Sequence, residues 1–208
     1  MSLLSRITNK ARSRPRHVVL PEGDDRRTMA AANVLVNEGI AEVSLVGDGG
    51  ALQSLAREHG IDLEGVRIAD PSDPEIRDRC AETIHKMRKH KGVSRDQAQD
   101  LVGDRLMLGA AMVRSGMADG MVAGAAHPTA DVVRSALQLI GMREGSNIVS
   151  SFFLMEHDMP HQAIQGTAIY ADCAMVIDPT AEQLASIAMD TADSARALAG
   201  IKPRIALL

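Results

Sequence analysis

Short apolar runs alternate with longer helical patterns between residues 17 and 69, and this alternation constrains the fold more than any other feature of the sequence. The apolar runs are residues 17–20, 42–46 and 66–69. Helical patterns at residues 25–36 and 51–59 separate them, and each is followed by a glycine of the kind that commonly ends a helix. Runs this short and apolar are typical of parallel strands that are buried on both faces. The pattern therefore predicts an α/β fold in which a mainly parallel sheet is flanked by helices.

The alternation continues along the chain and changes in character near residue 145. Further helices are predicted at residues 74–92, 94–115 and 129–142, with a strand at residues 119–124. Beyond them come strand-like runs at residues 148–155, 168–170 and 174–177, then a helix at 180–198 and a strand at 203–208. Because strands here follow one another without helices, we expect two domains. Residues 1–145 would form a nearly complete first α/β domain, and residues 146–208 the opening part of an incomplete second one.

Composition excludes several classes of function. The chain carries 23 Lys and Arg against 27 Asp and Glu, a net charge of −4, and it has one Tyr, two Phe and no Trp. Mild acidity and the scarcity of aromatic side chains argue against a nucleic-acid partner. Two cysteines are too few for a disulfide scaffold, and no apolar run reaches the roughly 18 residues of a membrane span. The basic first residues also lack the apolar core of a signal peptide. We therefore expect a cytoplasmic protein without a membrane partner.

The segment from Asp119 to Arg134 carries the strongest chemical signal. A strand runs through small residues, among them Gly124, into the start of a helix at His127-Pro128-Thr129. Small residues allow close approach of the backbone to a ligand, and a helix start offers free N–H groups to an anion. The Thr129 hydroxyl and the Arg134 guanidinium suit a phosphate. This predicts an anion site; the alternative is an ordinary strand–helix turn in which Thr129 or Asp131 caps the helix.

Two further segments have both a functional and an ordinary interpretation. Residues 85–91 hold four Lys and Arg at a helix end, where they complement the helix dipole or clamp the phosphates of a coenzyme. Residues 19–27 follow a strand, and Glu22 with Arg26 could reach into a cleft. A plain strand–turn–helix start explains that segment equally well.

Other site classes are not supported. No Gly-x4-Gly-Lys-Ser/Thr loop is present, and Leu52 stands where a dinucleotide-binding loop needs its third glycine. His157 and His161 are spaced as on one face of a helix, but Pro160 between them disfavours a helix. We therefore predict no metal site, and we expect Cys80 and Cys173 to be small core residues.

The sequence resembles the phosphate acetyltransferase (phosphotransacetylase) family and its phosphate butyryltransferase relatives. The resemblance rests on residues 19–27, 88–92, 119–134, 150–155 and 170–188. It implies a two-domain fold similar to that of the isocitrate and isopropylmalate dehydrogenases, usually in a homodimer. It also implies transfer of an acetyl group between acetyl phosphate and coenzyme A, with inorganic phosphate as the other product and with no metal or cofactor beyond coenzyme A as substrate.

The resemblance also assigns residues. It implies that Arg134 binds phosphate or coenzyme A, that Arg88 binds the coenzyme's phosphates, and that Gly124, His127 and Thr129 border the substrate cleft. The family's proposed catalytic Asp, Ser and Arg are expected beyond Leu208. We therefore expect this chain to be an impaired N-terminal portion of the enzyme. The alternatives are a shortened natural form, a phosphate butyryltransferase, and a non-catalytic regulatory module that binds coenzyme A or an acyl phosphate.

Overall fold

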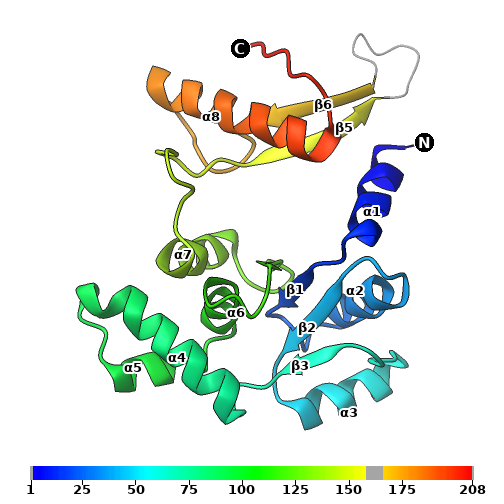
Figure 1. Ribbon diagram of the computed structural model, residues 1–208, viewed down its shortest axis with the longest axis vertical. Helices are drawn as coiled ribbons and strands as arrows, with labels where there is room; N and C mark the ends of the chain where they lie inside the picture. The colour runs from blue at the N-terminus through cyan, green and yellow to red at the C-terminus, as the bar shows by residue number, and fades with distance from the viewer. Residues whose placement is uncertain (1, 158–165, 208) are drawn as a thin grey trace. The chain divides into compact units, whose positions relative to one another are not determined.

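The computed structural model describes residues 2–157 and 166–207, and it divides into two compact units (Figure 1). One unit is formed by residues 10–141, and the other by residues 1–9 together with residues 142–208. The first residues thus group with the C-terminal part of the chain, which the sequence pattern did not predict. Each unit is described by itself.

Unit 10–141 is built on a four-stranded sheet in the order β3-β2-β1-β4, and all of its pairings are parallel. The strands are β1 His17–Leu20, β2 Glu42–Val46, β3 Arg67–Ala69 and β4 Gly120–Met121. The predicted mainly parallel α/β architecture is confirmed. Strand β4 is much shorter than the strand predicted at residues 119–124. The chain leaves the sheet after Val122, whose N–H donates to the Val19 carbonyl.

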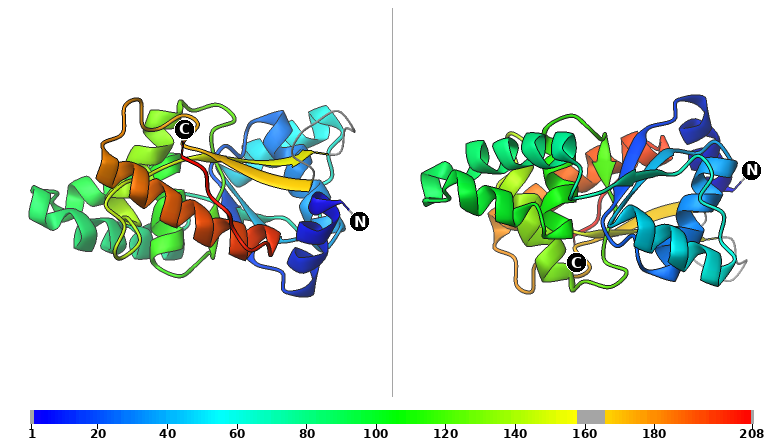
Figure 2. Two further views of the ribbon diagram at one scale, coloured as in Figure 1. Left: turned by 90° about the horizontal axis from the view of Figure 1, so that it is seen from above. Right: turned by 90° about the horizontal axis from the view of Figure 1, so that it is seen from below.

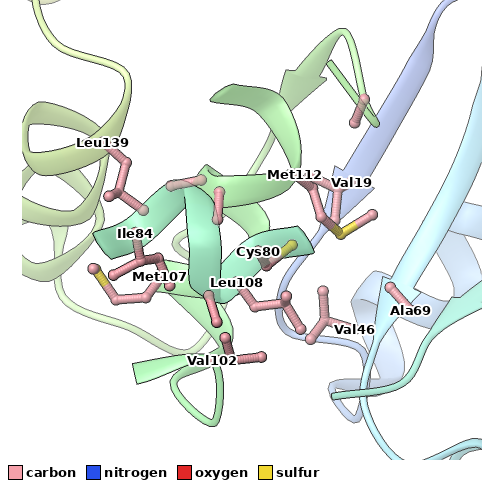
Figure 3. Close-up of a cluster of buried hydrophobic side chains, with 14 of the residues drawn as sticks. Val19, Val46, Ala69, Cys80, Ile84, Val102, Met107, Leu108, Met112 and Leu139 are labelled. Atoms are coloured by element: carbon pink, nitrogen blue, oxygen red, sulfur yellow. The ribbon is translucent and has the colours of Figure 1, made fainter. Parts of the chain in front are cut away.

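Helices cover both faces of this sheet, as two views from opposite sides show (Figure 2). They are α2 Arg26–Asn37, α3 Gly49–His59, α4 Pro74–Arg88, α5 Arg95–Leu101, α6 Arg105–Arg114 and α7 Thr129–Leu139. Alternate strand residues face opposite ways, so Leu20 packs with the α2 and α3 side chains while Val19 packs with those of α4 and α6. Figure 3 shows the core on the Val19 side of the sheet, in which Ile84, Leu108 and Leu139 are fully buried.

The prediction of a single helix over residues 94–115 is wrong, because two helices, α5 and α6, form there. The chain turns at residues 102–104, and the Asp104 carboxylate accepts the Met107 N–H at 3.0 Å and so begins α6. The start of α5 follows the sequence, since Ser94 and Gln97 form a reciprocal capping box. The helix predicted over 74–92 ends at Arg88 and continues only as a 3-10 turn, Lys89–Lys91. Cys80 on α4 is a core residue as predicted, and its burial raises the pKa of the thiol to about 11.

The other unit contains an antiparallel strand pair, β5 Phe152–His157 with β6 Gly166–Ala171, and helix α8 Ala181–Ser194, which continues as a π-helical turn, Ala195–Ala199. Thr180 and Gln183 form the predicted capping box of α8. Helix α1, Leu3–Ser13, begins in this unit, where the Leu3 N–H donates to Glu156 at 2.8 Å. No helix of the described ranges is long and apolar enough to cross a membrane.

Two strands predicted in this unit are absent from the described residues. Residues 174–177 form a turn, because the N–H groups of Ala174, Met175 and Val176 donate to the Asp172 carboxylate rather than to a neighbouring strand. Residues 203–207 have no regular structure, and residue 208 lies outside the described residues. An apolar sequence run is therefore not sufficient for a strand when a nearby carboxylate bonds its backbone.

Candidate functional site

The candidate site lies where two neighbouring parallel strands end. Strand β1 leads into Pro21-Glu22-Gly23, and its neighbour β4 leads into the loop of residues 122–128, which opens α7. Ligands of open parallel sheets bind at the carboxyl ends of strands, because loops from adjacent strands converge there. The structure thus brings the Glu22 segment and the loop after β4 together, although they are about a hundred residues apart in the sequence.

The Glu22 carboxylate occupies the centre of this loop. Its Oε2 accepts the N–H groups of Gly124 at 2.9 Å and Ala125 at 2.7 Å. Its Oε1 accepts the N–H groups of Ala126 at 2.7 Å and His127 at 2.8 Å, together with Nδ1 of the His127 ring at 2.9 Å. The residue is only 2% exposed. One buried carboxylate therefore holds four consecutive backbone N–H groups and one imidazole.

The charge on Glu22 follows from these contacts. Burial alone would raise the pKa of this carboxyl, but the hydrogen bonds from Ala126, from the His127 ring and from the other loop N–H groups outweigh it and lower the pKa to about 2. Glu22 is therefore ionised at neutral pH, and the loop is closed around an internal anion.

This arrangement adds to the predicted anion site. The sequence indicated free N–H groups at the first turn of the helix that begins at Thr129, and the structure shows that the N–H groups just before that helix, those of residues 124–127, are occupied by Glu22. Glu22 also does not reach outward with Arg26. Instead Arg27, which sequence reasoning missed, pairs with Asp25 at 2.7 Å and donates to the Ala125 carbonyl. The arginine pair in this segment was visible in the sequence, but nothing in it showed which arginine turns toward the loop.

The other predicted residues of this segment lie around the loop. Gly124 has a φ of +108°, a conformation that favours glycine. Thr129 is the first residue of α7 and is exposed, and Pro128 precedes it without any side-chain cap, so neither Thr129 nor Asp131 caps the helix. Arg134 is one turn further along α7, where its exposed guanidinium pairs with Asp131 at 2.6 Å.

Arg88 comes from a different helix. It is the last residue of α4, followed by the 3-10 turn of Lys89–Lys91, whereas Gly124, His127, Thr129 and Arg134 all belong to the segment after β4. Four of the five predicted binding residues therefore lie on one continuous segment, and Arg88 lies on another element.

A second, partly buried carboxylate organises a turn in the unit of residues 1–9 and 142–208. Asp172 accepts the N–H groups of the following turn and a hydrogen bond from the Ser151 hydroxyl. Burial would raise the pKa of Asp172, but the Ser151 hydroxyl and the N–H groups of Ala174 and Met175 hold it well below its usual range. Ser151 also lies 3.3 Å from the thiol of Cys173. This network closes a turn, and its donors are all used within the protein.

No cluster suited to a metal ion is found in residues 2–157 and 166–207, where no three His, Cys, Asp or Glu side chains come together appropriately. Of the His157–His161 pair singled out in the sequence, His161 lies outside the described residues. The ring of His157 instead contacts Tyr170, with ring centres 6.0 Å apart.

Comparison with known proteins gives the same result in sequence and in structure. Residues 2–208 match the family model described as phosphate acetyl/butaryl transferase. The phosphate acetyltransferases of Thermoanaerobacterium thermosaccharolyticum and Acetivibrio thermocellus are 40% and 41% identical over the whole chain. The chain spans 63% and 62% of their lengths. A phosphotransacetylase from Streptococcus pyogenes has a similar structure, with a TM-score of 0.87 and 34% identity over 97% of this chain and 59% of that one.

Proposed function

Because the chain belongs to the phosphate acetyl/butaryl transferase family, we propose that the protein it represents transfers an acetyl group between acetyl phosphate and coenzyme A. The family match over residues 2–208 is the observation that carries this proposal. The relatives named phosphate acetyltransferase support acetyl as the acyl group. The family description also covers butyryl transfer, which is the second candidate.

In the reaction, the coenzyme A sulfur attacks the acetyl carbonyl carbon, a C–S bond forms, and the C–O bond to phosphate breaks. The thiol proton must pass to a base, and the developing charge on the carbonyl oxygen needs donors. We assign phosphate binding to Arg134, Thr129 and His127, with Gly124 shaping the loop, and coenzyme A binding to Arg88 and Arg134.

Glu22 does not fit the role of the base, because five hydrogen bonds occupy its carboxylate and lower its pKa to about 2. The proposal places the base in the part of the relatives that this chain does not span. We accordingly expect residues 2–208 alone to be strongly impaired in turnover.

Several finer features belong to the same proposal. The fold would be similar to that of the isocitrate and isopropylmalate dehydrogenases, with residues 1–145 as the first domain and residues 146–208 as the opening of the second. The active protein would be a cytoplasmic homodimer that acts in acetate metabolism without a metal or a cofactor other than coenzyme A as substrate. The family resemblance supports these features.

The proposal is tested by assaying acetyl-CoA formation from acetyl phosphate and coenzyme A, beside the Thermoanaerobacterium thermosaccharolyticum relative. Calorimetry with coenzyme A, acetyl phosphate and butyryl phosphate should accompany the assay. We expect binding of coenzyme A and an acyl phosphate, with turnover far below that of the relative. Binding without any turnover would favour the regulatory module, and tighter binding of butyryl phosphate would favour the second candidate. Absence of all binding would contradict the proposal.

Replacing Arg134 by alanine should weaken binding of phosphate or coenzyme A by about 1–3 kcal/mol, because a charged hydrogen-bond donor is lost. Its pairing with Asp131 is exposed, so the substitution should leave the stability of the chain nearly unchanged. Calorimetric titration with inorganic phosphate and coenzyme A measures the effect. The matched control is Arg57→Ala on α3, which removes an exposed arginine whose side chain donates to Gln53 and Ser54 of the same helix. Equal affinities for the two variants would assign Arg134 to an ordinary helix surface.

A further inference from the structure

The loop of residues 124–127 has no main-chain N–H group left for a ligand. Its four N–H groups and the His127 Nδ1 all contact the two oxygens of Glu22 at 2.7–2.9 Å. An ionised carboxylate offers about four acceptor sites, so these five contacts saturate it. A substrate phosphate that approached the loop backbone would have to displace an anion that belongs to the protein.

The loop is also held from its carbonyl side. The Arg27 guanidinium donates to the Ala125 carbonyl, and Asp25 fixes that guanidinium with contacts at 2.7 Å and 3.0 Å. The loop is therefore fastened at both its donors and its acceptors by side chains from the segment after β1. Such a loop presents a defined surface instead of adjusting to a ligand.

The hydrogen bond to Glu22 determines which nitrogen of His127 carries the proton. The ionised carboxylate can only accept, so Nδ1, 2.9 Å from Oε1, must be the donor. In the neutral ring the lone pair then belongs to Nε2, which can accept a hydrogen bond from a phosphate O–H, whereas in the protonated ring Nε2–H donates to a phosphate oxygen. The His127 side chain is 36% exposed, whereas that of Glu22 is 3% exposed. Nε2 is therefore the ring nitrogen left to meet a ligand.

We propose that Glu22 is a positioning residue: it occupies the main-chain cradle of the loop and fixes His127 so that Nε2, and not the loop backbone, meets the phosphorylated substrate. The inference rests on the proposed function. The phosphate would then contact side chains of the loop and of α7, namely His127, Thr129 and Arg134. Glu22 itself touches no substrate atom and acts through His127.

The test uses the whole 208-residue chain with ¹⁵N-labelled histidine. Nitrogen NMR at a pH where the ring is neutral should show the Nδ1–H tautomer for His127. Glu22→Gln should weaken the preference for this tautomer, because the negative charge that favours an Nδ1–H donor is lost and the amide NH₂ group faces two loop N–H donors. Calorimetry with inorganic phosphate should show affinity about tenfold weaker, the loss of roughly one charge-assisted hydrogen bond. The control is Asp70→Asn, the same carboxylate-to-amide change in a turn that bonds Gly49 and Ser72, and it should change neither readout.

The outcomes are distinct. An Nε2–H tautomer in the unmodified chain overturns the inference without any variant, as does unchanged phosphate affinity in Glu22→Gln. Should Glu22→Gln not fold, His127→Ala keeps the four backbone bonds of Glu22 and should still weaken phosphate binding about tenfold, one charge-assisted hydrogen bond. Unchanged affinity in that variant also overturns the inference. Failure of the unmodified chain to bind phosphate, acetyl phosphate or coenzyme A would instead contradict the proposed function, and this inference would fall with it.

Discussion

Replacing Glu22 by alanine is expected to lower the free energy of unfolding of unit 10–141 by about 3–5 kcal/mol, as loss of one member of a buried charged network does. The substitution removes the acceptor to which four consecutive loop N–H groups donate, and it leaves a cavity at a position that is 2% exposed. Hydrogen exchange of the α6 amides measures the effect, because α6 is almost entirely buried in this unit.

The contribution of Glu22 to the free energy of unfolding should decrease as the pH falls. The pKa of Glu22 is about 2 in the folded chain against an ordinary value of 4.5. The folded state therefore holds the proton less tightly than the unfolded state, so stability from this group is present above pH 4.5 and is lost as pH falls toward 2. A difference of that size corresponds to roughly 3 kcal/mol. The stability difference between the unmodified chain and Glu22→Ala should accordingly shrink over this range.

A matched control separates this effect from a general loss of negative charge. The Glu38 side chain is half exposed, and within the described part of the chain its carboxylate pairs with the exposed Arg12 alone. Glu38→Ala should change the free energy of unfolding by at most about 1 kcal/mol, as exposed ion pairs do. A similar loss in both variants, or a pH-independent difference for Glu22→Ala, would contradict the role given to the loop contacts.

The parallel sheet could be predicted because its physical signal is local. Val19 and Leu20 in β1, like Val43, Leu45 and Val46 in β2, are apolar because both faces of these strands are buried, and the helix between the strands ends at a glycine-containing turn. The division between α5 and α6 was missed for the opposite reason. Helix α6 is buried nearly all round, so it has no apolar stripe whose phase could have shown that a new helix begins at Asp104.

The part of the candidate site that involves Glu22 could not be predicted from the sequence. Small residues before a helix led us to predict a ligand anion at residues 119–134, and that binding stays a prediction. The anion that contacts this loop in the structure is Glu22, which reaches the loop only because β1 and β4 are neighbours in the sheet. Local sequence does not contain that neighbourhood, since it depends on strand order. The turn after Asp172 is a second example. The apolar run of residues 174–177 predicted a strand, but its backbone N–H groups donate to the Asp172 carboxylate.

Gly23→Val is expected to destabilise unit 10–141 by about 3 kcal/mol or more, at the upper end of what overpacking costs. A Cβ at Gly23 would overlap the Val46 carbonyl oxygen and would lie 3.2 Å from the Val46 carbonyl carbon and 3.3 Å from the Leu45 Cβ. Because two of these neighbours are backbone atoms of a central strand, no side-chain rotation relieves the overlap, and the turn that carries Glu22 must move.

The displacement predicted for Gly23→Val has a second consequence that distinguishes it from simple loss of packing. Glu22 precedes Gly23, so a shifted turn withdraws the carboxylate from the loop, and amides 124–127 should exchange faster even under conditions where α6 stays protected. The control is Gly120→Val in β4, where an added Cβ has no atom of the described chain within 4 Å and valine suits a strand. Urea unfolding followed by circular dichroism, with hydrogen exchange of the loop, measures both effects. Equal midpoints for the two variants, or a loop that exchanges no faster than α6, would show that the turn tolerates a side chain at Gly23 and that its contact with Val46 does not hold Glu22 in place.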